Sequence, residues 1–157
     1  MCSKYDTLTG VLNRNGIDVC KNMFVKQSEI RGIYLNIKNF AWYNYEKGHS
    51  EGDIILQSLV YLIKMISIIR DKENLIFRIA GDEFIVFFPN LEYKEVVLID
   101  DYILNTFYKL KIPNYNSKSN IKYLSVYSHI ISLNKEEIFK SSNVNEYISN
   151  IIFNKNK

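Results

Sequence analysis

Two short apolar runs meet at a tight turn in Leu75-Ile76-Phe77-Arg78-Ile79-Ala80-Gly81-Asp82-Glu83-Phe84-Ile85-Val86-Phe87-Phe88. Residues 75–79 and 83–88 have the length and the apolar content of strands, and Ala80-Gly81-Asp82 lies between them. The stretch therefore predicts a β-hairpin, whose second strand ends at Pro89. A hairpin supplies an antiparallel pair of strands from which a larger sheet can be built.

The hairpin lies between segments with strand and helix patterns. Apolar and polar residues alternate over residues 31–40, which predicts a strand with Asn36 and Lys38 on one face. The order of the elements favours an α/β (α+β) fold, a layered sandwich with a central mixed or antiparallel sheet and flanking helices. The remaining elements predicted from periodicity are helices over residues 9–29, 53–69, 91–110 and 145–153, and a strand over residues 121–133.

The composition is that of one globular domain over residues 1–157. Apolar residues make up 47% and charged residues 24%, which excludes a disordered chain. A net charge of +3 is too small to argue for a nucleic-acid partner. The apolar runs are too short to span a membrane, and the first residues lack the apolar core of a signal peptide. Cys2 and Cys20 fit neither a disulfide framework nor a zinc pattern, so we expect a reduced, cytoplasmic setting.

Three segments match the motifs of one family in order and spacing. Together they resemble the entry motif, the central motif and the signature turn of GGDEF domains. The resemblance is best over residues 6–88, and residues 89–157 diverge from the family pattern. The matching segments are Asp6-Thr7-Leu8-Thr9-Gly10-Val11-Leu12-Asn13-Arg14, then Asn44 with Gly48-His49 and Gly52-Asp53, then Arg78-Ile79-Ala80-Gly81-Asp82-Glu83-Phe84.

The resemblance implies a diguanylate cyclase-like domain, a nucleotidyltransferase with the palm-like fold of nucleotide polymerases. Domains of this kind join two GTP molecules into cyclic di-GMP with Mg²⁺ or Mn²⁺, with one GTP on each subunit of a homodimer. Such phosphoryl transfer depends on positioning and on neutralising charge, which two metal ions accomplish by holding the attacking and leaving oxygens. The implied partners are a guanine nucleotide and a second GGDEF domain, in a homodimer or a heterodimer.

The turn supplies the residues that the resemblance assigns to chemistry. Asp82 matches a metal ligand of the family, in keeping with the preference of Mg²⁺ for carboxylate oxygens. Glu83 matches the residue that helps to deprotonate the 3′-hydroxyl or holds a second ion. Gly81 lets the backbone approach the nucleotide closely.

The central motif supplies the expected nucleotide site. Asn44 and Asp53 match the pair that hydrogen-bonds the edge of guanine. A carboxylate accepts from the N1–H and N2–H₂ groups of that base, and an asparagine adds a donor and an acceptor. Phe40 matches the aromatic residue that precedes this motif. In the alternative interpretation, Asp53 is an ordinary helix cap and Asn44 an ordinary turn residue.

The chain departs from the family on the strand over residues 31–40. Asn36 stands where the family has a metal-binding Asp, and Lys38 stands where it has a second Asp. The two changes shift the local charge by three positive units, so a metal site that includes Asn36 should be weak. Lys38 is expected near the metal position, where it would contact phosphate or Asp82 in place of the cation. In the alternative interpretation both residues are relics or solvated groups.

Three functions compete. The first, which we favour, is a degenerate GGDEF domain that binds GTP or cyclic di-GMP with weak or no cyclase activity. The second is an active diguanylate cyclase or related cyclic-dinucleotide synthase, supported by the intact Gly81-Asp82-Glu83-Phe84. The third is a non-catalytic dimerisation or regulatory module that keeps only the fold. The loss of one metal-binding Asp at Asn36 leaves the enzyme class open.

Overall fold

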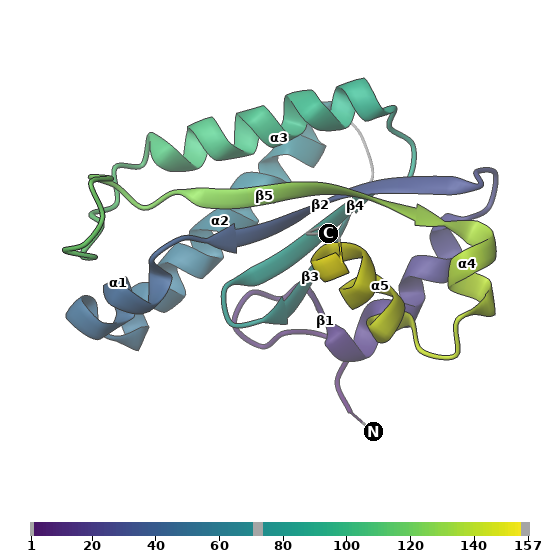
Figure 1. Cartoon of the computed structure of the whole chain (residues 1–157), viewed down its shortest axis with the longest axis horizontal. Helices are drawn as coiled ribbons and strands as arrows, with labels where there is room; N and C mark the ends of the chain where they lie inside the picture. Colours follow the sequence, from purple (N-terminus) through teal and green to yellow (C-terminus); the bar gives the residue numbers. More distant parts are fainter. Residues whose placement is uncertain (1, 71–73, 155–157) are drawn as a thin grey trace.

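The computed structural model of the chain describes residues 2–70 and 74–154. One mixed sheet, in the order β1-β3-β4-β2-β5, forms its centre (Figure 1). β1 pairs with β3 in parallel, and the other three neighbouring pairs are antiparallel, so the predicted hairpin and the predicted sandwich are confirmed. The strands are β1 (Leu12–Asn13), β2 (Glu29–Ile37), β3 (Leu75–Ala80), β4 (Glu83–Phe88) and β5 (Val126–Asn134).

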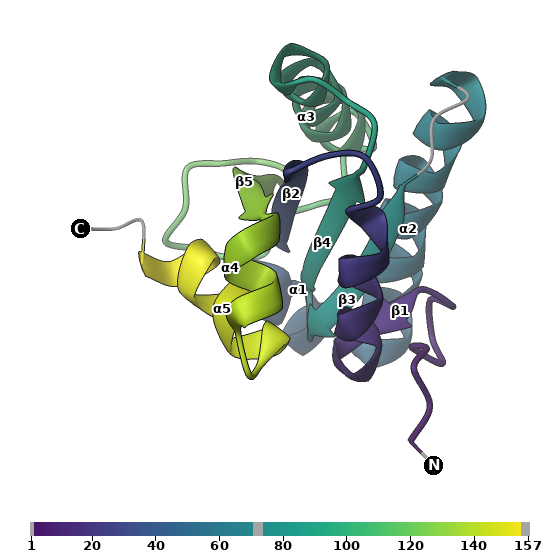
Figure 2. The ribbon, with the colours of Figure 1, turned by 90° about the vertical axis from the view of Figure 1, so that its right-hand side faces the viewer.

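Helices cover both faces of the sheet. α2 (His49–Arg70) and α3 (Tyr93–Tyr108) lie on one face, and α1 (Phe40–Lys47) follows the end of β2. The other face carries the 3₁₀ helix η1 (Arg14–Met23), α4 (Lys135–Lys140) and α5 (Val144–Phe153) (Figure 2). Within the described residues, none of the helices is both long and apolar enough to cross a membrane.

Alternation along the strands divides the core into two layers. Leu35 of β2 and Phe84 of β4 are fully buried in the cluster beneath α2 and α3. Tyr34 and Ile85, one position away, belong to the cluster beneath η1, α4 and α5. Because successive side chains point to opposite faces, Asn36 and Lys38 lie on the face of Tyr34. The polar end of β2 therefore faces the side of the sheet that α5 covers.

The predicted helix over residues 9–29 is wrong. The chain first turns at Gly10, whose φ of 74° is incompatible with a continuing right-handed helix. Asp6 fixes this turn by accepting hydrogen bonds from the backbone N–H and the hydroxyl of Thr9. β1 then pairs with β3, and η1 begins after Asn13, whose side chain accepts from the backbone N–H of Asn15.

Other boundaries also differ from the prediction. The strand predicted over residues 31–40 ends at Ile37, because Asn39 adopts a left-handed conformation with a φ of 62° and α1 follows. The strand predicted over residues 121–133 begins only at Val126. The sequence does not predict the short helices α1 and α4, because helices of 8 and 6 residues are too short to display a clear helical periodicity. The helices expected over residues 53–69, 91–110 and 145–153 are confirmed as α2, α3 and α5.

Candidate functional site

The hairpin turn and the end of β2 lie side by side. Asn36 is the direct partner of Glu83 in the antiparallel ladder of β2 and β4. Gly81, with a φ of 39°, closes the turn, and the Arg78 Nε donates a hydrogen bond of 2.8 Å to its carbonyl oxygen. Asp82 and Glu83 are both half-buried. The structure thus brings together four of the predicted site residues at one edge of the sheet.

Arg78 connects this turn to the entry motif. Its Nη1 lies 3.1 Å and 3.2 Å from the two carboxylate oxygens of Asp6, and both side chains are only 18% exposed. Burial alone would raise the pKa of Asp6, but the hydrogen bonds from Thr9 and the charge of Arg78 outweigh it, so the pKa lies below its ordinary value. Asp6 is therefore a half-buried structural anion that positions the arginine of the turn.

Asp82 lies against the end of β2. Burial raises its pKa above the ordinary value, and the neighbouring negative charge of Glu83 adds to the increase. A hydrogen bond from the backbone N–H of Ile37 and the charge of Arg78 oppose this increase in part. Two carboxylates in adjacent positions of a tight turn repel each other, so a cation or hydrogen-bond donors would stabilise their charged forms.

Tyr34 supplies one such donor. Its hydroxyl donates a hydrogen bond of 2.5 Å to Oε1 of Glu83, and the side chain of Asn36 beside it favours a lower pKa of Tyr34. Burial raises the pKa of Tyr34 above its ordinary range, and the hydrogen bond to Glu83 and the charges of Glu83 and Asp82 raise it further. The motifs of the sequence do not single out Tyr34. Its signal is a tyrosine two positions before Asn36, on the same strand face, where a buried hydroxyl needs a partner.

Lys38 lies elsewhere than expected. It is exposed, and its Nζ lies 5.8 Å from the centre of the Tyr127 ring on β5. The sequence suggested that Lys38 would contact Asp82 or a phosphate in place of a cation. The structure instead places its ammonium group over an aromatic face, at a distance typical of a cation–π contact.

The second group of predicted residues gathers where α1 meets α2. The side-chain oxygen of Asn44 is buried and finds no hydrogen-bond donor among the described residues. It lies against Gly52, at which an added Cβ would stand 1.8 Å from Oδ1 of Asn44 and 3.2 Å from Cζ of Phe40. Asp53 follows Gly52 on α2 and is half-buried. Phe40 and Asn44 therefore pack against Gly52 in one compact corner, and Asp53 is the next residue along α2.

The side chains at the turn do not fit a divalent-cation site. Asn36 is neutral where the family has a carboxylate, and Glu83 already accepts a hydrogen bond from Tyr34. Across residues 2–70 and 74–154, no three His, Cys, Asp or Glu side chains gather closely enough to hold a metal ion. Mg²⁺ prefers several hard oxygen ligands, and the turn offers the carboxylates of Asp82 and Glu83 without the third carboxylate that the family places at residue 36.

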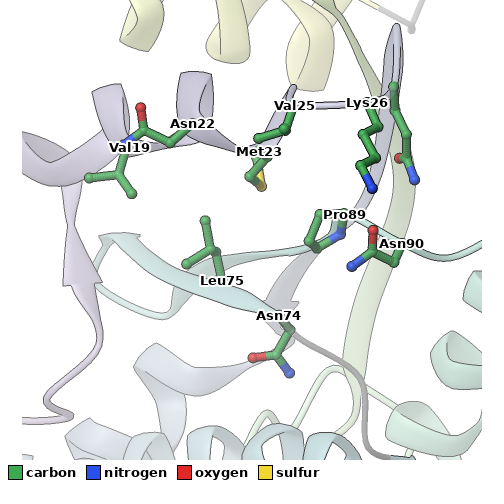
Figure 3. A pocket seen from close by; sticks show the side chains of 10 residues that line it. Val19, Asn22, Met23, Val25, Lys26, Asn74, Leu75, Pro89 and Asn90 are labelled. Carbon is green, nitrogen blue, oxygen red and sulfur yellow. The ribbon is translucent and has the colours of Figure 1, made fainter.

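A separate hollow opens at the other end of the hairpin. Its volume is about 570 Å³, and it lies between η1 and the ends of β3 and β4 (Figure 3). Met23 and Val25 face Leu75 and Pro89 across it. None of the predicted site residues lines this hollow.

Comparison with known proteins identifies the family and the fold. The model of the family described as "Diguanylate cyclase, GGDEF domain" matches residues 3–149. The GGDEF domain of DgcB from Caulobacter crescentus, solved in complex with c-di-GMP, has a TM-score of 0.72 at 17% identity, covering 97% of this chain and 87% of that one. The FimX GGDEF domain from Pseudomonas aeruginosa has a TM-score of 0.68 at 15% identity, covering 96% and 90%.

Two curated relatives are closer in sequence. The uncharacterized protein YhcK of Bacillus subtilis is 32% identical over 108 residues, which cover 65% of this chain and 29% of YhcK. Diguanylate cyclase DgcS of Shewanella oneidensis is 37% identical over 91 residues, which cover 55% of this chain and 30% of DgcS. The chain thus spans under a third of the length of these two relatives. Because the family model matches almost the whole chain, the chain belongs to the GGDEF domain family.

Proposed function

We propose that this GGDEF domain binds a guanine nucleotide, GTP or cyclic di-GMP, and makes cyclic di-GMP weakly or not at all. The observation that carries the proposal is the buried, unpartnered side-chain oxygen of Asn44 in the described part of the chain, one helix away from Asp53. A buried polar atom without a partner is costly, and a ligand that donates to it recovers that cost.

Guanine suits this corner chemically. Its N1–H and N2–H₂ groups are adjacent donors, which the carboxylate of Asp53 can accept together. Adenine presents an acceptor at N1, so the same carboxylate would repel it. Asn44 contributes both a donor and an acceptor toward the remaining edge of the base. The corner therefore favours guanine over adenine.

Weak or absent synthesis follows from the turn. Phosphoryl transfer requires charge neutralisation beside the α-phosphate. The neutral Asn36 leaves this chain without one carboxylate of the ligand set that such a reaction needs, and Tyr34 competes for Oε1 of Glu83. Lys38, above Tyr127, supplies a positive charge on the same strand face but cannot polarise a hydroxyl as a metal ion does.

Calorimetric titration tests the binding. We expect heat on adding GTP or cyclic di-GMP and none on adding ATP. Asp53→Ala should weaken GTP binding roughly 10- to 100-fold, the value of one or two hydrogen bonds to a charged group. Asp101→Ala, an exposed acid on α3, is the matched control and should leave the affinity unchanged. An Asp53→Ala chain that binds GTP as tightly as wild type would contradict the proposed site.

Chromatography of the products tests the synthesis. Incubation with GTP and Mg²⁺ or Mn²⁺ should give no clear cyclic di-GMP peak. A wild-type peak would favour the active-cyclase alternative. The absence of both binding and product would favour a dimerisation or regulatory module, and sedimentation would then test pairing with itself or with an active GGDEF domain. We propose such pairing as the arrangement in which the domain acts.

A further inference from the structure

The carboxylate of Glu83 already has an internal partner. In the ladder of β2 and β4, Asn36 stands opposite Glu83 and Tyr34 stands opposite Ile85, so Tyr34 is the diagonal neighbour of Glu83 on the same face. Diagonal neighbours are within reach of a long aromatic side chain. The Tyr34 hydroxyl uses this reach to donate its hydrogen bond of 2.5 Å to Oε1.

The Tyr34 ring is held in that position from two sides. The residue is 6% exposed within the core beneath η1, α4 and α5. Phe153, near the end of α5, packs edge-on against the ring, with centroids 6.2 Å apart and planes at 72°. A well-packed buried ring has few alternative rotamers, so its hydroxyl stays directed at Glu83.

We propose that the Tyr34 hydroxyl competes with a divalent cation for Oε1 of Glu83, so that restoring a carboxylate at residue 36 alone gives only weak cation binding at this turn. Asn36 alone explains a missing negative charge. Tyr34 adds a second obstacle, because a cation that binds through Oε1 of Glu83 would have to displace a short hydrogen bond to a charged acceptor. The displaced hydroxyl would lose its charged partner in a largely buried position, which is itself unfavourable.

The amide of Asn36 strengthens the arrangement. Its side chain lies beside the same hydroxyl and opposes part of the rise in the pKa of Tyr34, so the polar groups of Tyr34, Asn36 and Glu83 form one cluster. Within this cluster Glu83 has a hydrogen-bond donor without any added ion. Substitution of Asn36 by aspartate restores one ligand but leaves the Tyr34 hydroxyl in place.

Mn²⁺ binding measured by electron paramagnetic resonance tests the inference without any nucleotide. The inference therefore stands or falls independently of guanine binding at Asn44 and Asp53. We expect negligible Mn²⁺ binding by the wild-type chain and weak binding by Asn36→Asp. The double variant Tyr34→Phe with Asn36→Asp should bind Mn²⁺ roughly 10- to 100-fold more tightly than Asn36→Asp, since a hydrogen bond to a charged group no longer competes.

The matched control is Tyr147→Phe in the Asn36→Asp background. Tyr147 also donates to a carboxylate, that of Glu137 at 3.1 Å, on α5 and α4. This control should bind Mn²⁺ no better than Asn36→Asp. Thermal unfolding confirms that each variant folds.

Two results would overturn the inference. One is tight Mn²⁺ binding by the wild-type chain. The other is equal affinity of Asn36→Asp and the double variant, which would leave Asn36 as the sole obstacle. If Tyr34→Phe fails to fold, the affinity of the Asn36→Asp chain for Mn²⁺ decides. An affinity in the micromolar range, typical of an intact carboxylate site, would contradict the role of Tyr34. An affinity in the millimolar range would support it.

Discussion

Gly52 allows α1 and α2 to approach each other closely, because it has no side chain. In most helix interiors a change from glycine to alanine gains about 1 kcal/mol. Here the new Cβ would stand 1.8 Å from Oδ1 of Asn44, so the Asn44 side chain has to move. The end of an asparagine side chain moves at little cost in free energy. A substitution at Gly52 can therefore change GTP binding while the stability of the fold stays nearly the same.

We predict that Gly52→Ala changes the free energy of unfolding by less than about 1 kcal/mol while GTP affinity falls at least about tenfold. Denaturant unfolding and calorimetry measure the two quantities on the same sample. Lys64→Ala, at an exposed position further along α2, is the control and should alter neither. Unchanged GTP affinity in Gly52→Ala would show that Asn44 does not contact the base.

The Asp6–Arg78 pair gives a prediction with a pH dependence. Because folding lowers the pKa of Asp6, its contribution to stability is complete above the ordinary value of 3.8 and is lost as the pH falls through the lower folded-state value. Asp6→Asn should lower the free energy of unfolding by about 1 to 3 kcal/mol at neutral pH. The difference between the two chains should stay constant down to about pH 5 and shrink toward zero as the pH falls further to about 2.

The exposed pair of Glu29 and Arg31 is the control for that experiment. Their side chains are 48% and 25% exposed, and such surface pairs contribute little. Glu29→Gln should cost well under about 1 kcal/mol at any pH. A constant difference between wild type and Asp6→Asn across the pH range would mean that the carboxylate charge is unimportant.

The sequence predicts the positions and partners of some site residues better than those of others. Asp82, Glu83 and Asn36 were placed together correctly because a motif and strand alternation fix their positions. Tyr34 was missed because its partner is 49 residues away along the chain, and the pairing appears only when β2 and β4 are in register. Lys38 was placed on the correct face, but side-chain flexibility let it turn toward Tyr127.

Gly32 allows β2 to pack closely against β4. An added Cβ would lie 2.5 Å from Cδ1 of Phe87 and 2.7 Å from the backbone oxygen of Val86. A backbone oxygen in a central strand cannot move without disturbing the ladder. We predict that Gly32→Ala lowers the free energy of unfolding by about 1 to 3 kcal/mol, as overpacked cores usually do.

Denaturant unfolding measures that loss, with Ser132→Ala on the neighbouring strand β5 as the control. Ser132 lies in the same sheet but is only partly buried, so its loss of a hydroxyl should have little effect. Equal stability of Gly32→Ala and wild type would mean that the two strands can separate without cost. In that case the diagonal contact of Tyr34 with Glu83 would also be loosely held.

Elements with a strong period were predicted well, and short irregular ones were not. The strands of the hairpin are short apolar runs, and α2 and α3 each have apolar residues at helical spacing; a sequence displays both patterns directly. The apolar residues of η1 have helical spacing, but the turn at Gly10, which the hydrogen bonds of Asp6 hold, ends any continuous helix before η1 begins. The conformation there depends on Arg78, which lies far away in sequence.

The sheet links the two candidate regions at the scale of the whole molecule. β2 carries Asn36 at its end and leads directly into α1, which carries Asn44. The turn of β3 and β4 stands beside the end of β2, because Glu83 pairs with Asn36. A ligand that contacts both regions therefore binds only the folded chain, and its binding energy adds to the stability of the whole domain.

This linkage gives a prediction for the intact domain. GTP at about one hundred times its dissociation constant should add about 2.7 kcal/mol to the free energy of unfolding. For a domain of this size, that corresponds to a rise in Tm of roughly 5 to 11 °C. Since Tyr34 already satisfies Glu83, the rise should be nearly the same in EDTA as in Mg²⁺.

Differential scanning fluorimetry with GTP, ATP and cyclic di-GMP measures this rise, and the Asp53→Ala chain serves as the control. ATP should produce no rise, and Asp53→Ala should lose most of the rise with GTP. A rise that requires Mg²⁺ would indicate that the turn binds a cation with the nucleotide, against the role assigned to Tyr34. A rise of equal size with ATP would instead indicate that phosphate contacts, and not the corner of Asn44 and Asp53, provide the binding energy.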